Sequence, residues 1–202
     1  TGNIDTSEIE KNVSKKTKGL ILVHMAGYPC DMKKILKICK RYKIILLEDC
    51  AHAVGTFYEK KHVGNFGMSG SFSFYPTKQI TTGEGGAILT NDTDLAAKIR
   101  CLRSGGITHD STEFSSDWSC DANGDPHPWA YEMHYLGYNY RLTDFQCALG
   151  ISQLKKLPKF IASRQEIAHK YDQEFANYER VAIYSLDLNS PIKSTNVRYV
   201  GI

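Results

Sequence analysis

One lysine and one aspartate are the residues of this chain best suited to chemistry. Lys78 ends the run Ser71-Phe-Ser-Phe-Tyr-Pro-Thr-Lys78 and precedes the turn Gly83-Glu-Gly-Gly86, and Asp49 closes an apolar run upstream. Pyridoxal phosphate requires an amine that holds it as a Schiff base, an acid that keeps its ring nitrogen protonated, and hydroxyl or amide groups for its phosphate. Lys78, Asp49 and Ser73 supply one of each, so the pattern predicts a pyridoxal phosphate site.

Each of these residues has a plainer interpretation when it is taken alone. An acid after a strand often caps the following turn or helix, and most lysines are simply solvated. The surroundings of Lys78 favour a site, because aromatic residues precede it and glycines that let backbone approach closely follow it. A partly desolvated lysine has a lowered pKa and can act as a nucleophile or general base. Asp49 ends a predicted buried strand, where ligands of open parallel sheets bind.

Other nucleotide chemistry is disfavoured by the motifs. The phosphate-binding pattern G-x-x-x-x-G-K-[ST] is absent, and no G-x-G-x-x-G opens a helix. These absences argue against nucleotide hydrolysis and dinucleotide redox chemistry.

The elements that must position Asp49 and Lys78 alternate between strands and helices. Gly19–Val23 and residues 43–47 are short apolar runs, typical of parallel strands covered on both faces. Asp31 is expected to cap a helix between them. That helix is predicted to bury four side chains at helical spacing: Met32, Ile35, Leu36 and Cys39. The result is a β-α-β unit.

The chain beyond this unit continues the alternation. Strands are expected over residues 71–75 and 86–90, and a helix after Asp92 or Thr93 carries Leu95, Ile99 and Leu102 inward. This order predicts a three-layer α/β/α domain with a mainly parallel sheet.

The second half of the chain has a different pattern. Residues 104–134 lose periodicity, and a structureless stretch of this length in a compact domain is usually functional or disordered. Helical spacing returns from Thr143, and Pro158 is expected to separate two helices. Residues 181–202 are expected to begin another sheet.

Composition limits the compartment and the partners. The chain has 202 residues, 42% of them hydrophobic, and its net charge of +3 comes from 25 basic and 22 acidic residues. This balance argues against nucleic acid or an anionic membrane as a partner. No apolar run approaches the roughly 18 residues of a membrane span, and the first residues lack the apolar core of a signal peptide. We expect a cytoplasmic protein.

The six cysteines are predicted to be reduced thiols, because their spacing is irregular and contains no C-x-x-C. Cys39, Cys50 and Cys147 lie within apolar patterns, as small buried residues do. Cys120, His127 and His134 fit no zinc-binding template, so we expect no metal.

Three segments together resemble the DegT/StrS-type nucleotide-sugar aminotransferases. They are Glu48-Asp49-Cys-Ala-His52, the run Gly70 to Lys78 with Gly83 to Gly86, and Gly137-Tyr-Asn139-Tyr-Arg141-Leu-Thr-Asp144. The resemblance extends from about residue 3 to 180. It implies a fold-type I large domain over residues 1–178 and the start of a C-terminal small domain over 179–202. It also implies that the chain is truncated at both ends.

The resemblance implies a role for each site residue. Lys78 is the Schiff-base lysine and proton carrier, Asp49 pairs with the ring nitrogen, and Ser73 binds the phosphate. His52 lies beside the ring, and Asn139 reaches the phosphate of the neighbouring subunit's cofactor, so a homodimer shares its active sites. Without the resemblance, Asn139 and Arg141 are a polar loop pair that bonds to backbone.

The implied reaction is transamination of a nucleotide-linked ketosugar in amino-sugar biosynthesis, with glutamate as the expected donor. Residues 128–136, from Pro128-Trp129 to Leu136, look most like the branch that aminates a UDP-4-keto-6-deoxy-N-acetylhexosamine for pseudaminic acid. One alternative is a pyridoxal-phosphate-dependent sugar dehydratase of the same fold, against which Lys78 argues because that enzyme works without a Schiff-base lysine. The other is a non-catalytic protein that binds pyridoxal phosphate or a partner.

Two features depart from the family pattern. Arg103-Ser-Gly105-Gly106 has glycine where relatives commonly show Arg-x-His-Gly, and the family's upstream Gly-Thr phosphate turn has no counterpart here.

Overall fold

The computed structural model describes residues 2–176 and divides the chain into two compact units. The first unit is Thr1–Asn91 with Asp144–Ile202, and the second is Asp92–Thr143. The predicted domain boundary at residue 178 and the sheet expected over 181–202 lie outside the described residues.

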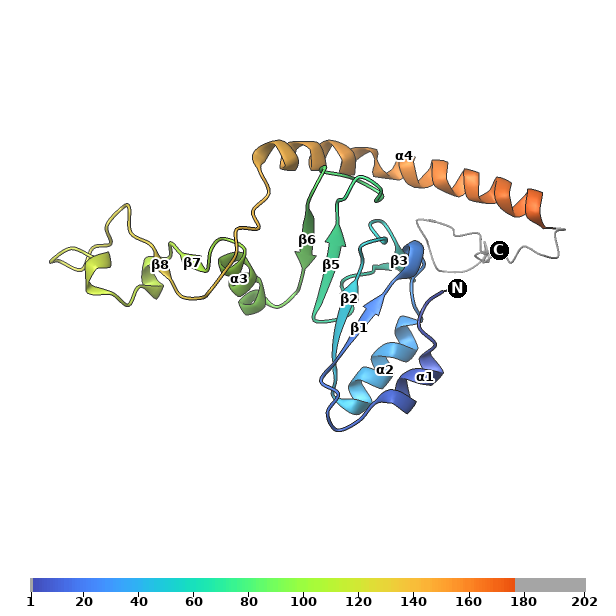
Figure 1. The fold of residues 1–202 in the computed structure, drawn as a ribbon, viewed down its shortest axis with the longest axis horizontal. Coiled ribbons are helices and arrows are strands. Elements are labelled where there is room, and N and C mark those ends of the chain that lie inside the picture. Colours follow the sequence, from blue (N-terminus) through green and yellow to red (C-terminus); the bar gives the residue numbers. More distant parts are fainter. Residues whose placement is uncertain (1, 177–202) are drawn as a thin grey trace. The chain divides into compact units, whose positions relative to one another are not determined.

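A four-stranded sheet organises the first unit (Figure 1). Its strands are β1 (Gly19–Val23), β2 (Ile45–Asp49), β5 (Ser69–Ser73) and β6 (Gly86–Leu89), in the order β1-β2-β5-β6. The β1–β2 and β2–β5 pairs are parallel, and β6 runs antiparallel to β5. The prediction of an α/β fold with a mainly parallel sheet is confirmed. The short strands β3 (Phe57–Tyr58) and β4 (Lys61–His62) pair in the loop between β2 and β5.

Strand β2 begins later than the apolar run suggested, because Lys43 ends the preceding helix. Lys43 has a left-handed backbone with φ 53°, and its N–H bonds to the Cys39 carbonyl. A helix that closes in this way uses residue 43 as its cap. Strand β5, in contrast, begins earlier than predicted, at Ser69 instead of residue 71.

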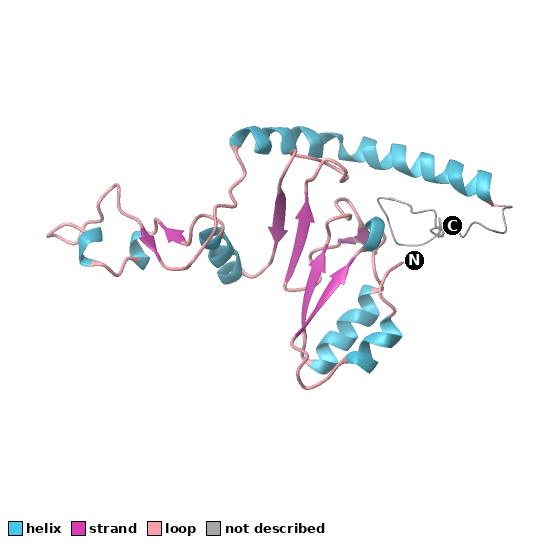
Figure 2. Cartoon of the chain, viewed as in Figure 1, coloured by secondary structure: helices cyan, strands magenta, loops and turns pink. Residues whose placement is uncertain are grey.

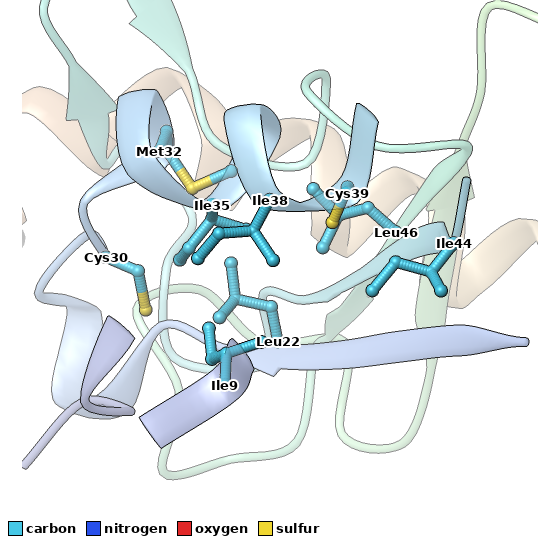
Figure 3. Packing of buried hydrophobic residues seen from close by; sticks show 9 residues of the cluster. All are labelled: Ile9, Leu22, Cys30, Met32, Ile35, Ile38, Cys39, Ile44 and Leu46. Carbon is cyan, nitrogen blue, oxygen red and sulfur yellow. The ribbon is translucent and has the colours of Figure 1, made fainter. Parts of the chain in front are cut away.

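Two helices cover one face of β1 and β2. They are α1 (Thr6–Asn12) and α2 (Met32–Tyr42), and the predicted cap is present because the Asp31 side chain accepts from the Lys34 N–H. A short 3-10 turn, η1 (Met25–Gly27), leads towards α2. The core lies between the helices and the strands, as Figure 3 shows, and contains Ile9, Leu22, Cys30, Met32, Ile35, Ile38, Cys39, Ile44 and Leu46.

The prediction that Leu36 points into this core is wrong. Leu36 is 36% exposed, whereas Ile38 is buried. Met32, Ile35, Ile38 and Cys39 share one stripe at helical spacing, and at about 100° per residue Leu36 falls beyond the edge of that stripe.

The opposite face of β1 and β2 is exposed over the residues that the structure describes. Ile21 is 70% exposed, and Val23 and Ile45 are exposed too. The expectation that both faces are covered is therefore not met within residues 2–176.

The second unit begins with α3 (Thr93–Leu102), whose N-terminus is capped by Asp92. Its predicted inward residues Leu95, Ile99 and Leu102 are half-buried. The segment expected to be structureless contains short elements: β7 (Ile107–Thr108), η2 (Ser111–Glu113), η3 (Asp117–Ser119) and β8 (Glu132–Met133). Strands β7 and β8 pair antiparallel.

A single long helix, α4 (Asp144–Phe175), follows in the first unit, and Figure 2 shows it as one continuous helix. The predicted break at Pro158 is wrong. A proline removes one intrahelical hydrogen bond, and the rest of a long helix has enough bonds to continue past that loss.

The described cysteines are all free, as expected for reduced thiols. Cys39 and Cys50 are buried as predicted, but Cys147 is exposed on α4, so its predicted burial is wrong. Within residues 2–176, no helix combines the length and the apolar character that a membrane crossing requires.

Candidate functional site

The carboxyl end of β2 carries Asp49 on the exposed face of the sheet. Asp49 pairs in register with Val23 of β1 and Ser71 of β5, and residues paired in register point to the same side. Ser73, two residues beyond Ser71, therefore also lies on this face. Asp49 and Ser73 thus lie at one edge of the sheet, as predicted, and Ser71 joins them. Ser71 was not among the predicted site residues, although alternation along β5 could have indicated it.

The Asp49 carboxylate has a structural role as well. Its Oδ1 accepts the Ala51 N–H at 2.9 Å, so Asp49 does cap the turn that follows β2. This bond engages one of the two carboxylate oxygens. Asp49 is half-buried, which keeps its carboxylate within reach of a ligand on the open sheet face.

His52 connects Asp49 and Lys78 electrostatically. Burial lowers the pKa of His52, the positive charge of Lys78 lowers it further, and the negative charge of Asp49 opposes the shift. Lys78 and Asp49 therefore both lie near the His52 ring. The lowered pKa keeps the imidazole neutral at neutral pH.

Backbone hydrogen bonds shape the turn that carries Lys78. The Lys78 N–H donates to the Tyr75 carbonyl at 3.0 Å, and the Phe74 N–H donates to the Gly85 carbonyl at 2.9 Å. Gly86 is required where this turn enters β6, since a Cβ there would lie 2.6 Å from the Phe72 carbonyl oxygen. The glycine-rich run thus closes the loop that connects β5 to β6, and Lys78 lies half-buried within that loop.

Two side chains fasten the backbone around Lys78. The amide nitrogen of buried Gln79 donates to the His52 carbonyl and ties the two turns together. The Arg164 guanidinium of α4 donates to the Lys78 and Gln79 carbonyls at 3.3 and 3.4 Å. Neither side chain was predicted as part of the site, and no sequence signal pairs Arg164 with a turn so far away along the chain.

A buried carboxylate beside Asp49 organises the loop that leads into β5. Glu48 is 1% exposed. It accepts the backbone N–H groups of Gly64, Phe66 and Gly67, each at 2.7 Å, and His24 Nε2 at 3.1 Å. Burial raises the pKa of Glu48, but these hydrogen bonds outweigh it, so the pKa lies below its ordinary value.

His24, Glu48 and Cys50 offer ligand atoms within 4.8 Å of one another, a spacing that could hold a metal ion. The fold already uses these atoms. His24 Nδ1 accepts the Cys30 N–H at 3.1 Å, so Nε2 carries the proton that it donates to Glu48. Burial, with the charges of Glu48 and Asp49, raises the pKa of the Cys50 thiol and disfavours the thiolate that binds metals. We therefore assign this cluster to the architecture.

Asn139 lies in the second unit and is exposed. Its segment is bound to the backbone after α3, since Ser104 and Asn139 form a bridge and the Gly105 N–H donates to the Tyr138 carbonyl at 2.8 Å. Gly106 is required, because a Cβ there would lie 1.7 Å from the Tyr135 carbonyl oxygen. The predicted site residues are thus divided: Asp49, His52, Ser73 and Lys78 belong to the first unit and Asn139 to the second.

Known proteins resemble this chain over most of its length. The family model described as the DegT/DnrJ/EryC1/StrS aminotransferase family matches residues 1–201. The GDP-perosamine synthase of Caulobacter vibrioides is 38% identical over 176 residues, which are 87% of this chain and 43% of that protein. The UDP-4-amino-4,6-dideoxy-N-acetyl-beta-L-altrosamine transaminase of Helicobacter pylori is 37% identical over 174 residues, 86% of this chain and 42% of that protein.

Solved structures confirm the predicted fold-type I architecture. The Helicobacter pylori aminotransferase PseC, involved in pseudoaminic acid biosynthesis, has a TM-score of 0.82 and 35% identity over 96% of this chain and 47% of its own. The Escherichia coli GDP-4-keto-6-deoxy-D-mannose-3-dehydratase with bound hydrated PLP has a TM-score of 0.76 and 29% identity over 96% of this chain and 48% of its own. The chain spans less than half the length of these relatives.

Proposed function

Because this chain belongs to the DegT/DnrJ/EryC1/StrS aminotransferase family, we propose that the whole protein transfers an amino group to a keto carbon of a nucleotide-linked sugar, with pyridoxal phosphate as cofactor. The observation that carries the proposal is geometric: strand register places Asp49 and Ser73 on one face of the sheet, and the Gln79 amide bonds the Lys78 turn to the His52 carbonyl. An amine, an acid, an imidazole and a hydroxyl therefore come from the ends of β2 and β5 and the two turns that follow them.

These residues fit the cofactor. When bound, pyridoxal phosphate supplies an electron sink at its ring. The Asp49 carboxylate would hold a proton on the ring nitrogen, and the Ser73 hydroxyl would donate to the phosphate. Lys78 Nζ would hold the cofactor covalently and later carry a proton between the carbons that exchange the amine. Neutral His52 would lie beside the ring without adding charge.

The rigid backbone around Lys78 serves this role. The Arg164 guanidinium donates to the Lys78 and Gln79 carbonyls, and the Gln79 amide donates to the His52 carbonyl, so the backbone that carries Lys78 is anchored on two sides. Proton transfer depends on donor and acceptor staying within hydrogen-bond reach, which a fixed backbone favours.

The finer substrate is also a proposal. The two relatives above are named for different nucleotide sugars, one linked to GDP and one to UDP, at nearly equal identity. The run Pro128-Trp129-Ala-Tyr131-Glu132-Met133 favours a UDP-4-keto-6-deoxy-N-acetylhexosamine as acceptor. Glutamate is the proposed donor. We further propose a homodimer in which Asn139 contributes to the partner's phosphate site.

The second candidate is a sugar dehydratase, since a dehydratase of the same fold is among the solved relatives. Incubating the whole protein with pyridoxal phosphate, glutamate and the UDP-ketosugar separates the candidates by the mass of the product. An amino sugar that disappears in Lys78→Ala supports transamination. A product that has lost oxygen without gaining nitrogen identifies a dehydratase, and an unchanged sugar identifies a non-catalytic protein.

A further inference from the structure

The second unit contains a buried carboxylate that the proposed reaction does not use. Glu132 of β8 is 6% exposed and accepts the N–H groups of Ser115 and Ser116, each at 2.9 Å. It also accepts the hydroxyls of Ser115 and Ser119 at 3.0 and 2.6 Å, and His134 Nε2 lies at 3.2 Å. A carboxylate with this many donors fixes the segment between η2 and η3 in one conformation.

A group of stacked aromatic rings adjoins this segment, and one of the rings, Trp118, belongs to η3. Trp118 and Trp129 lie 6.3 Å apart between ring centroids at an interplanar angle of 11°, and His127 stacks on Trp129 at 4.8 Å and 7°. The His127 N–H donates to the Ser119 carbonyl at 2.9 Å, which ties the two sides of the stack together. We name Trp118, His127 and Trp129 the aromatic platform.

The platform is not part of a core. Trp118 is 53% exposed and Trp129 is 64% exposed. Two adjacent indoles that are held exposed on an anchored segment form an apolar surface of the kind that marks a binding site. Parallel, pre-positioned rings suit the face of a heterocycle, because stacking then requires little further loss of conformational freedom.

The charges around the platform select which part of a nucleotide-linked sugar it could meet. Asp117 directly precedes Trp118 in the chain, and Asp121 lies three residues after it. Asp125 belongs to the same turn as Asp121, because the Asp121 side chain accepts the Asp125 N–H. Hydrogen bonds lower the pKa of Asp121, which keeps it ionised at neutral pH. Carboxylates repel a diphosphate but do not repel an uncharged base.

We propose that Trp118 and Trp129 form a stacking site for the base of the nucleotide-linked sugar, and that Glu132 is the residue that positions them. This proposal rests on the proposed function for the nature of the ligand. Base–aromatic stacking tolerates every base, since each has a π-face. The platform therefore contributes affinity for the nucleotide, and the choice between UDP and GDP is made by other contacts.

The test measures binding of UDP, GDP and inorganic pyrophosphate to the whole protein by calorimetry, without turnover. Stacking is worth about 1–3 kcal/mol per base, which corresponds to roughly 5- to 150-fold in affinity. Trp118→Ala and Trp129→Ala should weaken binding of the nucleotide diphosphate by that factor and leave pyrophosphate unaffected. Trp129→Phe should retain most of the affinity, and Tyr42→Ala, which removes an exposed aromatic from α2, should change nothing.

Glu132→Gln distinguishes positioning from simple contact. It should lower nucleotide affinity and increase hydrogen exchange over residues 111–119, while pyrophosphate binding stays the same. Nucleotide affinity that is unchanged in both folded tryptophan variants overturns the proposal, and a simultaneous loss of dimer would show a subunit contact instead. A wild-type protein that binds neither nucleotide overturns both this proposal and the proposed substrate class. Tryptophan-dependent binding without transamination would overturn only the proposed reaction.

Discussion

Replacing Glu48 by glutamine tests whether the buried carboxylate beside Asp49 holds the site together. Oε1 accepts the N–H groups of Phe66 and Gly67, and Oε2 accepts the Gly64 N–H and His24 Nε2. In the isosteric amide, one oxygen becomes an NH2 group that faces two donors. His24 cannot relieve this by changing tautomer, because its Nδ1 already accepts the Cys30 N–H.

The cost follows from these contacts. Each buried donor left unsatisfied costs about 1–3 kcal/mol, so two orphaned donors cost about 2–6 kcal/mol. A domain is stable by only about 5–15 kcal/mol. We therefore expect Glu48→Gln to lower the urea midpoint of unfolding of the whole protein markedly.

The matched control is Glu8→Gln, because Glu8 is exposed and forms an i,i+3 ion pair with Lys11. An exposed pair of this kind contributes at most about 1 kcal/mol. If the two variants unfold at the same urea concentration, the four hydrogen bonds to Glu48 do not stabilise the fold and the reasoning fails.

The same carboxylate predicts a pH dependence. The pKa of Glu48 lies below its ordinary value in the folded state, so its contribution to stability is present above that ordinary value and is lost as pH falls through the folded pKa. The free energy of unfolding of the wild type should fall as the pH drops below the ordinary pKa of a glutamate, and that of the Glu48→Gln variant should fall less steeply. Parallel pH profiles for the two proteins would contradict the assignment.

Four further predictions concern the proposed site. Lys78→Ala should abolish transamination. Borohydride reduction of the wild type followed by peptide mapping should place the cofactor label on Lys78, and a label on another lysine would refute the assignment. Asp49→Asn should lower kcat far more than cofactor affinity, because the amide cannot hold the ring proton as an ion pair; a near-normal kcat would leave Asp49 as a turn cap. Arg164→Gln should increase hydrogen exchange near the Lys78 turn and lower kcat, with Arg164→Lys intermediate; unchanged exchange would show that the two long hydrogen bonds do not fix the turn. Mixing Lys78→Ala with Asn139→Ala subunits should restore partial activity, since one site of each mixed dimer has both residues intact; mixed dimers confirmed by mass that stay inactive count against a shared site.

The sequence by itself determined the local elements whose cause is local. Asp31 caps α2 because its side chain reaches an N–H three residues on, and the apolar run Gly19–Val23 became β1 with the predicted bounds. The close backbone approach after Lys78 could also be predicted from its glycines, and at Gly86 the backbone indeed leaves no room for a side chain. Asp49, Ser73 and Lys78 could be singled out since their chemical types form an unusual set.

Only the tertiary structure decided which distant groups meet. The register that places Ser71 beside Asp49, and the bonds from Arg164 to the Lys78 turn, join segments far apart in the chain. In the sequence, Glu48 is simply the residue before Asp49. The tertiary structure shows that its carboxylate binds the backbone of the 64–67 loop. Helix α4 continued through Pro158 where a local rule predicted a break. Periodicity and propensity act over a few residues, whereas register, burial and hydrogen-bond partners depend on how the whole chain packs.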